Sequence, residues 1–290
     1  ASGKQLSQLL FEELKIPNVT LIKENFPKIA NVSKVDFSHD LVFCLSSTTS
    51  GVSFHDTDWI PAGKEGITIC DASSGAFIID VDWKKLDAVA FSWQKALGGE
   101  AGFGVIVLSP RAIERLKTFY PNRAIPRIFR IVNNGEINIP FFNGATINTP
   151  SMLCFQDVYD ILVWVDQSGG LPFLQQKVEK NYQMVCDWMK SQDVFNFLVE
   201  EKFRAHHIAC LDINNEKYLR LSKEDQWKFL QQILDLAAEK QYGYDFLGHA
   251  LTEPHIRIWC GPTIESEDSQ IFLPRLLEIY NEVASANGLS

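Results

Sequence analysis

The sequence predicts an α/β protein with a mostly parallel sheet, followed by a smaller α+β domain. Short apolar runs alternate with helical patterns through the first two-thirds of the chain, which is typical of a parallel sheet. Beyond a long helical stretch the order of strand and helix patterns changes. We therefore expect a large domain over residues 1–186 and a small C-terminal domain over residues 187–290, with the boundary near Asp187 inside that helical stretch.

The strands of the large domain are predicted from their apolar runs. The candidates are residues 19–22, 41–45, 66–70, 86–91 and 103–108. The run at 41–45 is continuous and apolar, as a strand buried on both faces of a sheet requires. Several of these runs end directly in polar residues.

Helices are predicted from the spacing of apolar residues and from proline and glycine. Residues 4–14 form an amphipathic pattern, and Pro110 is placed to open a helix. A long helical stretch over 151–188 is broken near Gly169. In the small domain we expect strands at 208–213 and 256–259, and helices at 223–240 and 269–284.

The charge of the chain argues against nucleic acid as a partner. Lys and Arg number 27 against 36 Asp and Glu, a net charge of −9, whereas phosphate-backbone binding requires a basic face. A local cluster of Arg and Lys over residues 111–130 is interpreted as a solvated helix face and the loop after it. No apolar stretch approaches the length of a membrane span, and no signal peptide is recognised.

The six cysteines indicate a reducing compartment. They lie far apart, with no CxxC pair and no histidine at ligand spacing. This spacing argues against a zinc site and against a disulfide framework. We expect no bound metal and a cytoplasmic location.

Polar residues follow three of the predicted strands, and these residues carry the candidate chemistry. They are Thr48, Asp71 and the pair Gln94-Lys95. Carboxyl ends of parallel strands meet at one edge of a sheet, so these side chains should converge. A lysine in a cleft is costly unless it is paired or used chemically, and a carboxylate can keep a pyridinium nitrogen protonated. The alternatives are a surface lysine at a strand end and a helix-capping role for Asp71.

Three segments of the chain resemble the phosphoserine aminotransferase family. They are CDASS at 70–74, FSWQKALGGE at 91–100 and TINTPSML at 146–153. This family belongs to class V of the fold-type I aminotransferases, which use pyridoxal 5'-phosphate. The resemblance implies that fold, with the mostly parallel sheet in the large domain and the smaller α+β domain at the C-terminus. It also implies a homodimer.

The resemblance assigns cofactor contacts to the residues at the strand ends. Lys95 would form the Schiff base with pyridoxal phosphate and later move the proton between substrate and cofactor carbons. Asp71 would pair with the pyridine nitrogen, and Thr48 would bond the phenolic oxygen. Gln94 matches the glutamine beside the lysine, at the cofactor phosphate.

Four further residues are matched outside the strand ends. Asn148 and Thr149 correspond to the pair that reaches the cofactor phosphate from the other subunit, although they could also cap the helix that begins near Ser151. Arg257 corresponds to the arginine that binds the substrate α-carboxylate, and its alternative is a structural ion pair. His249 is the candidate donor to the substrate phosphate.

The function implied is amino-group transfer between O-phosphoserine and 2-oxoglutarate in serine biosynthesis. The family's amino-terminal segment is missing from this sequence, and that segment carries a cofactor-phosphate loop, a ring-stacking aromatic residue and substrate-binding His and Arg residues. Ser46 stands where relatives usually have Asn. We therefore expect the chain by itself to be a poor transaminase. The alternatives are another class V enzyme that uses pyridoxal phosphate, and a truncated non-catalytic chain that keeps the fold.

Overall fold

A computed structural model describes residues 6–248 and 253–290 of the chain. Its larger sheet has the order β1-β2-β3-β4. The strands are β1 (Leu41–Cys44), β2 (Thr68–Asp71), β3 (Ala88–Phe91) and β4 (Val105–Leu108). The first three are parallel, and β4 runs antiparallel to β3. The predicted mostly parallel sheet is confirmed.

Four of the five predicted strands are present, and one prediction is wrong. Residues 19–22 pair with no neighbouring strand; they lie in a loop in which the side chain of Leu21 is 47% exposed. The reversal of β4 has a simple cause. A parallel connection requires a long crossover, usually a helix, whereas residues 92–104 contain only turns and coil.

Two predicted helix signals are confirmed, because Pro110 opens a helix and Gly169 interrupts the long helical stretch. The helix α2 (Pro110–Thr118) follows Ser109, whose hydroxyl accepts a hydrogen bond from the backbone of Ala112. The long helical stretch divides into α4 (Met152–Ser168) and α5 (Gly170–Met189) at Gly169, whose φ of 112° favours glycine. Of the predicted N-terminal helix over residues 4–14, residues 4 and 5 lie outside the described residues, residues 6–13 are helical and include the π-helix η1 (Leu9–Glu13), and Leu14 lies in a bend.

Several short elements were not predicted. They are η2 (Val32–Lys34), η3 (Trp83–Lys85), η4 (Arg127–Phe129), the hairpin of β5 (Val132–Asn133) and β6 (Glu136–Ile137), α3 (Ile139–Phe142), β7 (Phe195–Phe197), η5 (Glu201–Phe203) and α6 (Glu216–Leu219). None is longer than five residues, so none carries a periodic apolar pattern of useful length.

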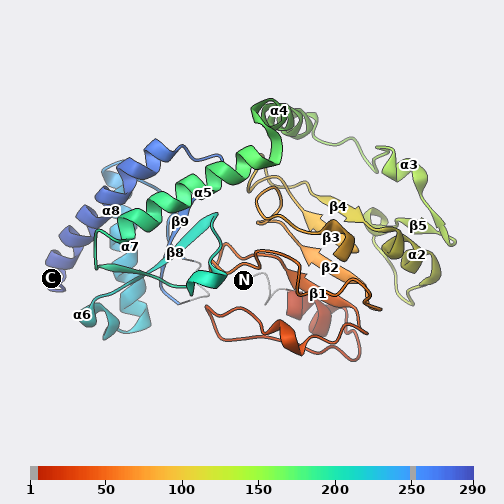
Figure 1. Cartoon of the computed structure of the whole chain (residues 1–290), viewed down its shortest axis with the longest axis horizontal. Helices are drawn as coiled ribbons and strands as arrows, with labels where there is room; N and C mark the ends of the chain where they lie inside the picture. Colours follow the sequence, from red (N-terminus) through yellow and green to blue (C-terminus); the bar gives the residue numbers. More distant parts are fainter. Residues whose placement is uncertain (1–5, 249–252) are drawn as a thin grey trace.

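The C-terminal part forms its own antiparallel sheet, in the order β7-β8-β9, with β8 (Ile208–Ile213) in the centre and β9 (Ile256–Trp259) at one edge. The helices α7 (Lys223–Glu239) and α8 (Ser266–Ala286) pack with this sheet around an apolar core. Figure 1 shows α5 running from the side of the larger sheet to the smaller one. The boundary near Asp187 stays a prediction.

None of the helices in the described part of the chain combines the length and apolar character that a bilayer crossing requires.

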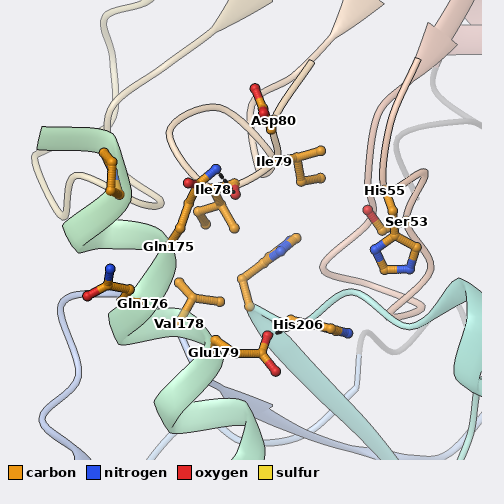
Figure 2. A pocket seen from close by; sticks show the side chains of 12 residues that line it. Ser53, His55, Ile78, Ile79, Asp80, Gln175, Gln176, Val178, Glu179 and His206 are labelled. Atoms are coloured by element: carbon orange, nitrogen blue, oxygen red, sulfur yellow. Dashed lines mark hydrogen bonds and ion pairs between the residues drawn. The ribbon is translucent and has the colours of Figure 1, made fainter. Parts of the chain in front are cut away.

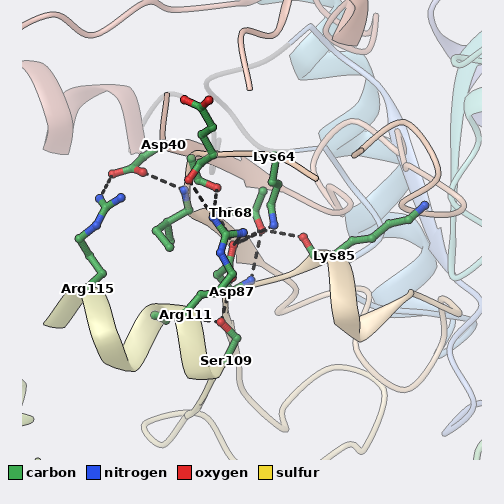
Figure 3. A network of polar contacts seen from close by, with 12 residues as sticks. Asp40, Lys64, Thr68, Lys85, Asp87, Ser109, Arg111 and Arg115 are labelled. Atoms are coloured by element: carbon green, nitrogen blue, oxygen red, sulfur yellow. Dashed lines mark hydrogen bonds and ion pairs between the residues drawn. The ribbon is translucent and has the colours of Figure 1, made fainter. Parts of the chain in front are cut away.

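A buried ion pair ties together the amino ends of the central strands (Figure 3). Lys64 Nζ lies 2.9 Å from Asp87 Oδ2, and both side chains are at most 3% exposed. Thr68 N and Ser109 Oγ donate to the same carboxylate at 3.0 and 2.8 Å. Burial raises the pKa of Asp87, but the bonds from Thr68, Lys64 and Ser109 outweigh it and hold the pKa below its usual value. This network fixes the strands at the end opposite the candidate site.

Candidate active site

The register of the sheet brings the carboxyl ends of β1, β2 and β3 together. Cys44 pairs with Asp71, and Asp71 pairs with Ala90. The backbone continues this pairing, because Ala72 N donates to Ala90 O at 2.8 Å. Lys95 follows β3 in the next turn. The convergence of the strand ends that the sequence predicts is therefore present in the backbone.

Asp71 caps the turn that follows β2, as one alternative expected. Its Oδ1 accepts a hydrogen bond from Ser73 N at 3.0 Å, and Cys44 Sγ lies 3.8 Å from Oδ2. Burial and the charge of Asp71 raise the pKa of Cys44 and of Cys70 to about 12, so both thiols stay protonated beside it. The half-buried carboxylate keeps further acceptor capacity, so capping does not exclude a cofactor contact.

Lys95 is half-buried and is not committed to a structural ion pair. No hydrogen bond or ion pair joins its ammonium to any residue in the ranges 6–248 and 253–290. Its backbone is anchored by Trp93, which is buried and stacked on Phe103 with ring centroids 5.8 Å apart. Gln94 accepts a hydrogen bond from Ser92 Oγ. The turn is held by its aromatic and polar neighbours while the amine itself remains available.

Arg257 and Thr48, which lie far apart in the sequence, are in contact. Arg257 Nη1 donates to Thr48 O at 3.2 Å, and its Nε donates to Leu247 O at 2.7 Å. No carboxylate of the described residues pairs with this guanidinium, so the alternative of a structural ion pair is not found there. Two of the five N–H donors are occupied, and the others can still grip a carboxylate.

The other matched residues are less constrained. Asn148 and Thr149 are exposed in the segment before α4. The cap of α4 is Ser151, whose hydroxyl accepts from Cys154 N at 3.5 Å, so the helix does not use either of the two preceding side chains as its cap. Among the described residues of the single chain, no hydrogen bond joins Asn148 or Thr149 to Lys95. His249 lies outside the described residues.

Sequence reasoning missed a buried polar group behind the strand ends. Ser46 Oγ lies 2.7 Å from Ser74 Oγ and 3.4 Å from His207 Nε2. Burial is the main cause that lowers the pKa of His207 to about 3, and the charges of His206, Lys95 and His55 act in the same direction. The only signal in the sequence is a histidine placed directly before an apolar strand, which does not indicate what the ring contacts.

A cavity of about 410 Å³ lies beside His207, between α5 and the loops that follow β1 and β2. Figure 2 shows His55 and His206 on one side of it and Glu179 and Gln175 on the helix. His206 Nδ1 contacts Glu179 Oε2 at 2.8 Å. Among the residues that the structure describes, no three His, Cys, Asp or Glu side chains are grouped to hold a metal ion.

Comparison with known proteins identifies relatives over most of the chain. Phosphoserine aminotransferase of Methanosarcina barkeri is 36% identical over 275 residues, which cover 94% of this chain and 71% of that enzyme. The Methanosarcina mazei enzyme of the same name is 36% identical over 267 residues, which cover 92% of this chain and 70% of that enzyme. The chain thus spans about 70% of the length of these relatives.

Solved structures agree in fold. Pyridoxal-phosphate-bound phosphoserine aminotransferase from Trichomonas vaginalis matches with a TM-score of 0.64 at 18% identity, over 82% of this chain and 60% of that one. Phosphoserine aminotransferase from Bacillus circulans subsp. alkalophilus matches with a TM-score of 0.66 at 18% identity, over 89% of this chain and 65% of that one. This chain therefore covers less than two thirds of either solved chain. The family model described as "Aminotransferase class-V" matches residues 27–232, and the chain therefore belongs to the class-V aminotransferase family.

Proposed function

We propose that the chain is the main cofactor-binding part of an aminotransferase that exchanges an amino group between O-phosphoserine and 2-oxoglutarate, as in serine biosynthesis, with pyridoxal phosphate as cofactor. The observation that carries the proposal is the half-buried Lys95, which has no ion-pair partner among the described residues. It follows a strand adjacent to the one that ends in Asp71. The names of the relatives at 36% identity support the substrate assignment.

The side chains at the strand ends fit the chemistry of pyridoxal phosphate. The group needs an amine for covalent attachment, an anion at its ring nitrogen and a hydrogen bond to its phenolic oxygen, and Lys95, Asp71 and Thr48 offer these. Gln94 has an amide suited to a phosphate oxygen. When bound, the cofactor supplies a ring that withdraws electrons from the carbon that loses its proton.

The chain's own residues would then divide the work. Asp71 would hold the proton on the ring nitrogen. Lys95, which no ion pair among the described residues holds elsewhere, would take the proton from the substrate Cα and return it. Arg257 would bind the α-carboxylate through the donors that Thr48 and Leu247 leave unused, and His249 would donate to the substrate phosphate.

A homodimer is part of the proposal. Asn148 and Thr149 would reach the cofactor phosphate of the partner subunit from the exposed segment before α4. The neighbouring helix face supports this arrangement, since large apolar side chains there are exposed: Met152 by 68%, Leu153 by 66% and Tyr159 by 64%. An exposed apolar face of this kind is typical of a surface that is covered by another subunit.

The remaining parts of the proposal concern domains and location. We assign residues 1–186 to the large domain and 187–290 to the small one, because separate apolar cores form around the two sheets. A cytoplasmic location is supported by the six cysteines, all of which are free thiols.

Borohydride reduction of the protein after incubation with pyridoxal phosphate tests the assignment of the lysine. Peptide mapping should find the pyridoxyl group on Lys95, and Lys95→Ala should abolish both the label and the cofactor absorbance. Lys84→Ala, an exposed lysine beyond the opposite end of β3, is the matched control and should bind cofactor normally. Label on another lysine in the wild-type protein would refute the assignment. Absence of any cofactor absorbance would favour a non-catalytic chain.

A further inference from the structure

Three buried polar side chains from three distant segments meet behind the candidate site. Ser46 follows β1, Ser74 lies in the turn after β2, and His207 immediately precedes β8 of the smaller sheet. Their exposed fractions are 7%, 8% and 1%. Polar groups as buried as these are hydrogen-bonded in native proteins, so their mutual contacts are expected to be maintained.

The hydroxyl protons of this cluster can be arranged in two ways. In the first, Ser74 Oγ donates to Ser46 O at 3.2 Å and Ser46 Oγ donates to Ser74 Oγ at 2.7 Å, so His207 Nε2 donates to Ser46 Oγ. In the second, Ser74 Oγ donates to Ser46 Oγ, and Ser46 Oγ donates to His207 Nε2. In both arrangements Ser46 Oγ and His207 Nε2 share a hydrogen bond. The ring stays neutral at physiological pH, because burial lowers the pKa of His207 to about 3.

Both serines belong to turns that carry candidate cofactor contacts. Ser46 lies in the same turn as Thr48, and Ser74 lies in the turn that Asp71 caps. His207 is fixed from the other side, since its carbonyl accepts a hydrogen bond from Cys260 N at 2.9 Å, just beyond the strand that carries Arg257. The imidazole therefore connects the Arg257 side of the molecule to the Thr48 and Asp71 turns.

We propose that His207 is a positioning residue, which through Ser46 and Ser74 holds the two cofactor-binding turns in register with the small domain. This rests on the proposed function. The role requires an uncharged hydrogen-bonding atom at the place of Nε2. A small displacement of these turns matters, because misplacement of reacting groups by about 1 Å can cost on the order of a hundredfold in rate.

The position of that atom makes the proposal testable with two amides. The terminal amide of glutamine reaches about as far as Nε2 of histidine and offers both a donor and an acceptor there, whereas the amide of asparagine reaches about as far as Nδ1. His207→Gln should keep the bond to Ser46 and hold the Kd for pyridoxal phosphate close to the wild-type value. His207→Asn should raise that Kd by about tenfold, the effect of one buried hydrogen bond. The pH at which the absorbance of the bound cofactor changes should move in the Asn variant alone.

The same two substitutions in a Ser46→Ala background separate this role from simple packing. The smaller asparagine leaves a cavity in both backgrounds, but the difference that depends on the hydrogen bond exists only when Ser46 is present. We expect the two amides to differ in Kd in the Ser46 protein and to converge in the Ser46→Ala protein. Equal Kd values for the two amides with Ser46 present, or an unchanged difference without it, would overturn the proposal.

The failure of the positioning role can be distinguished from failure of the proposed function. If wild-type protein forms no borohydride-reducible link at Lys95, the proposed function fails and the positioning role fails with it. If the link forms and the two amides behave alike, only the positioning role is overturned.

Discussion

Replacing Asp87 by Asn should destabilise the protein far more than the same change of carboxylate to amide at an exposed Asp–Lys ion pair. The Lys64 and Asp87 side chains are 2% and 3% exposed, and their charged atoms are 2.9 Å apart. The substitution leaves the buried Lys64 ammonium without its counter-ion and takes the same carboxylate from the guanidinium of Arg111. Removal of one partner of a buried pair costs about 3–5 kcal/mol.

Asp58 provides the matched control for that measurement. It pairs with Lys85 at the same distance of 2.9 Å, but its side chain is 84% exposed. Asp58→Asn should therefore change the free energy of unfolding by less than about 1 kcal/mol. Urea denaturation of both variants at neutral pH measures the difference. Equal midpoints for the two variants would refute the reasoning that burial decides the cost.

The Lys64–Asp87 pair also predicts how the free energy of unfolding depends on pH. The hydrogen bonds from Thr68, Lys64 and Ser109 outweigh burial and keep the pKa of Asp87 below its unfolded value. The resulting stabilisation is complete above the unfolded pKa of about 3.9 and is lost as pH falls through the lower folded value. The gap in stability between wild type and Asp87→Asn should thus narrow only in strong acid. A gap that narrows already near pH 6 would contradict this assignment.

Three further predictions concern the site and its surroundings. His207 has a folded pKa of about 3, below the unfolded value of about 6.5, so the stability that depends on its neutral form is complete above pH 6.5 and is lost as pH falls toward 3. His207→Gln should therefore make the free energy of unfolding depend less steeply on pH in that interval. An unchanged pH dependence of this free energy would count against a buried neutral ring. Arg257→Lys should raise KM for the amino-acid substrate by about tenfold or more, as measured by coupled turnover. A single ammonium cannot replace a planar guanidinium that bonds Thr48 O and still offers donors to a carboxylate, so an unchanged KM would exclude Arg257 from the substrate site. Leu153→Glu, at a position 66% exposed, should leave the melting temperature nearly unchanged but shift sedimentation from dimer toward monomer, and a dimer of undiminished strength would exclude this face of α4 from the interface.

The parts of the fold that could be predicted are those with long or continuous apolar patterns. The strand predictions at 208–213 and 256–259 coincide with β8 and β9, and the break at Gly169 separates α4 from α5. Residues 19–22 have a similar local pattern, but they pair with no strand in the described part of the chain, and a strand exists only as part of a sheet. Local sequence does not carry that information.

The candidate site, too, could be predicted from the sequence only in part. Asp71 and Lys95 could be placed at the sheet edge because each follows a recognisable strand of a parallel sheet. The contacts of His207 with Ser46 and of Arg257 with Thr48 join residues 161 and 209 positions apart. Such contacts depend on how the segments around the β7-β8-β9 sheet meet those that follow β1, and no periodicity along the chain encodes that arrangement.

The loop after β1 is joined to the C-terminal part of the chain by several hydrogen bonds. Thr48 O and Thr49 O accept hydrogen bonds from Arg257 and His255, and Gly51 O accepts from Ala205 N at 2.7 Å. Gly51 has a φ of 73°, and a Cβ there would lie 2.8 Å from Cys210 Sγ, so only glycine allows this approach. Because Arg257, His255 and Ala205 hold the loop through its backbone carbonyls, the Thr48 hydroxyl is left for other contacts. A shift of β9 would therefore move Arg257 and the backbone of Thr48 together, so the two proposed contacts with cofactor and substrate would stay in register.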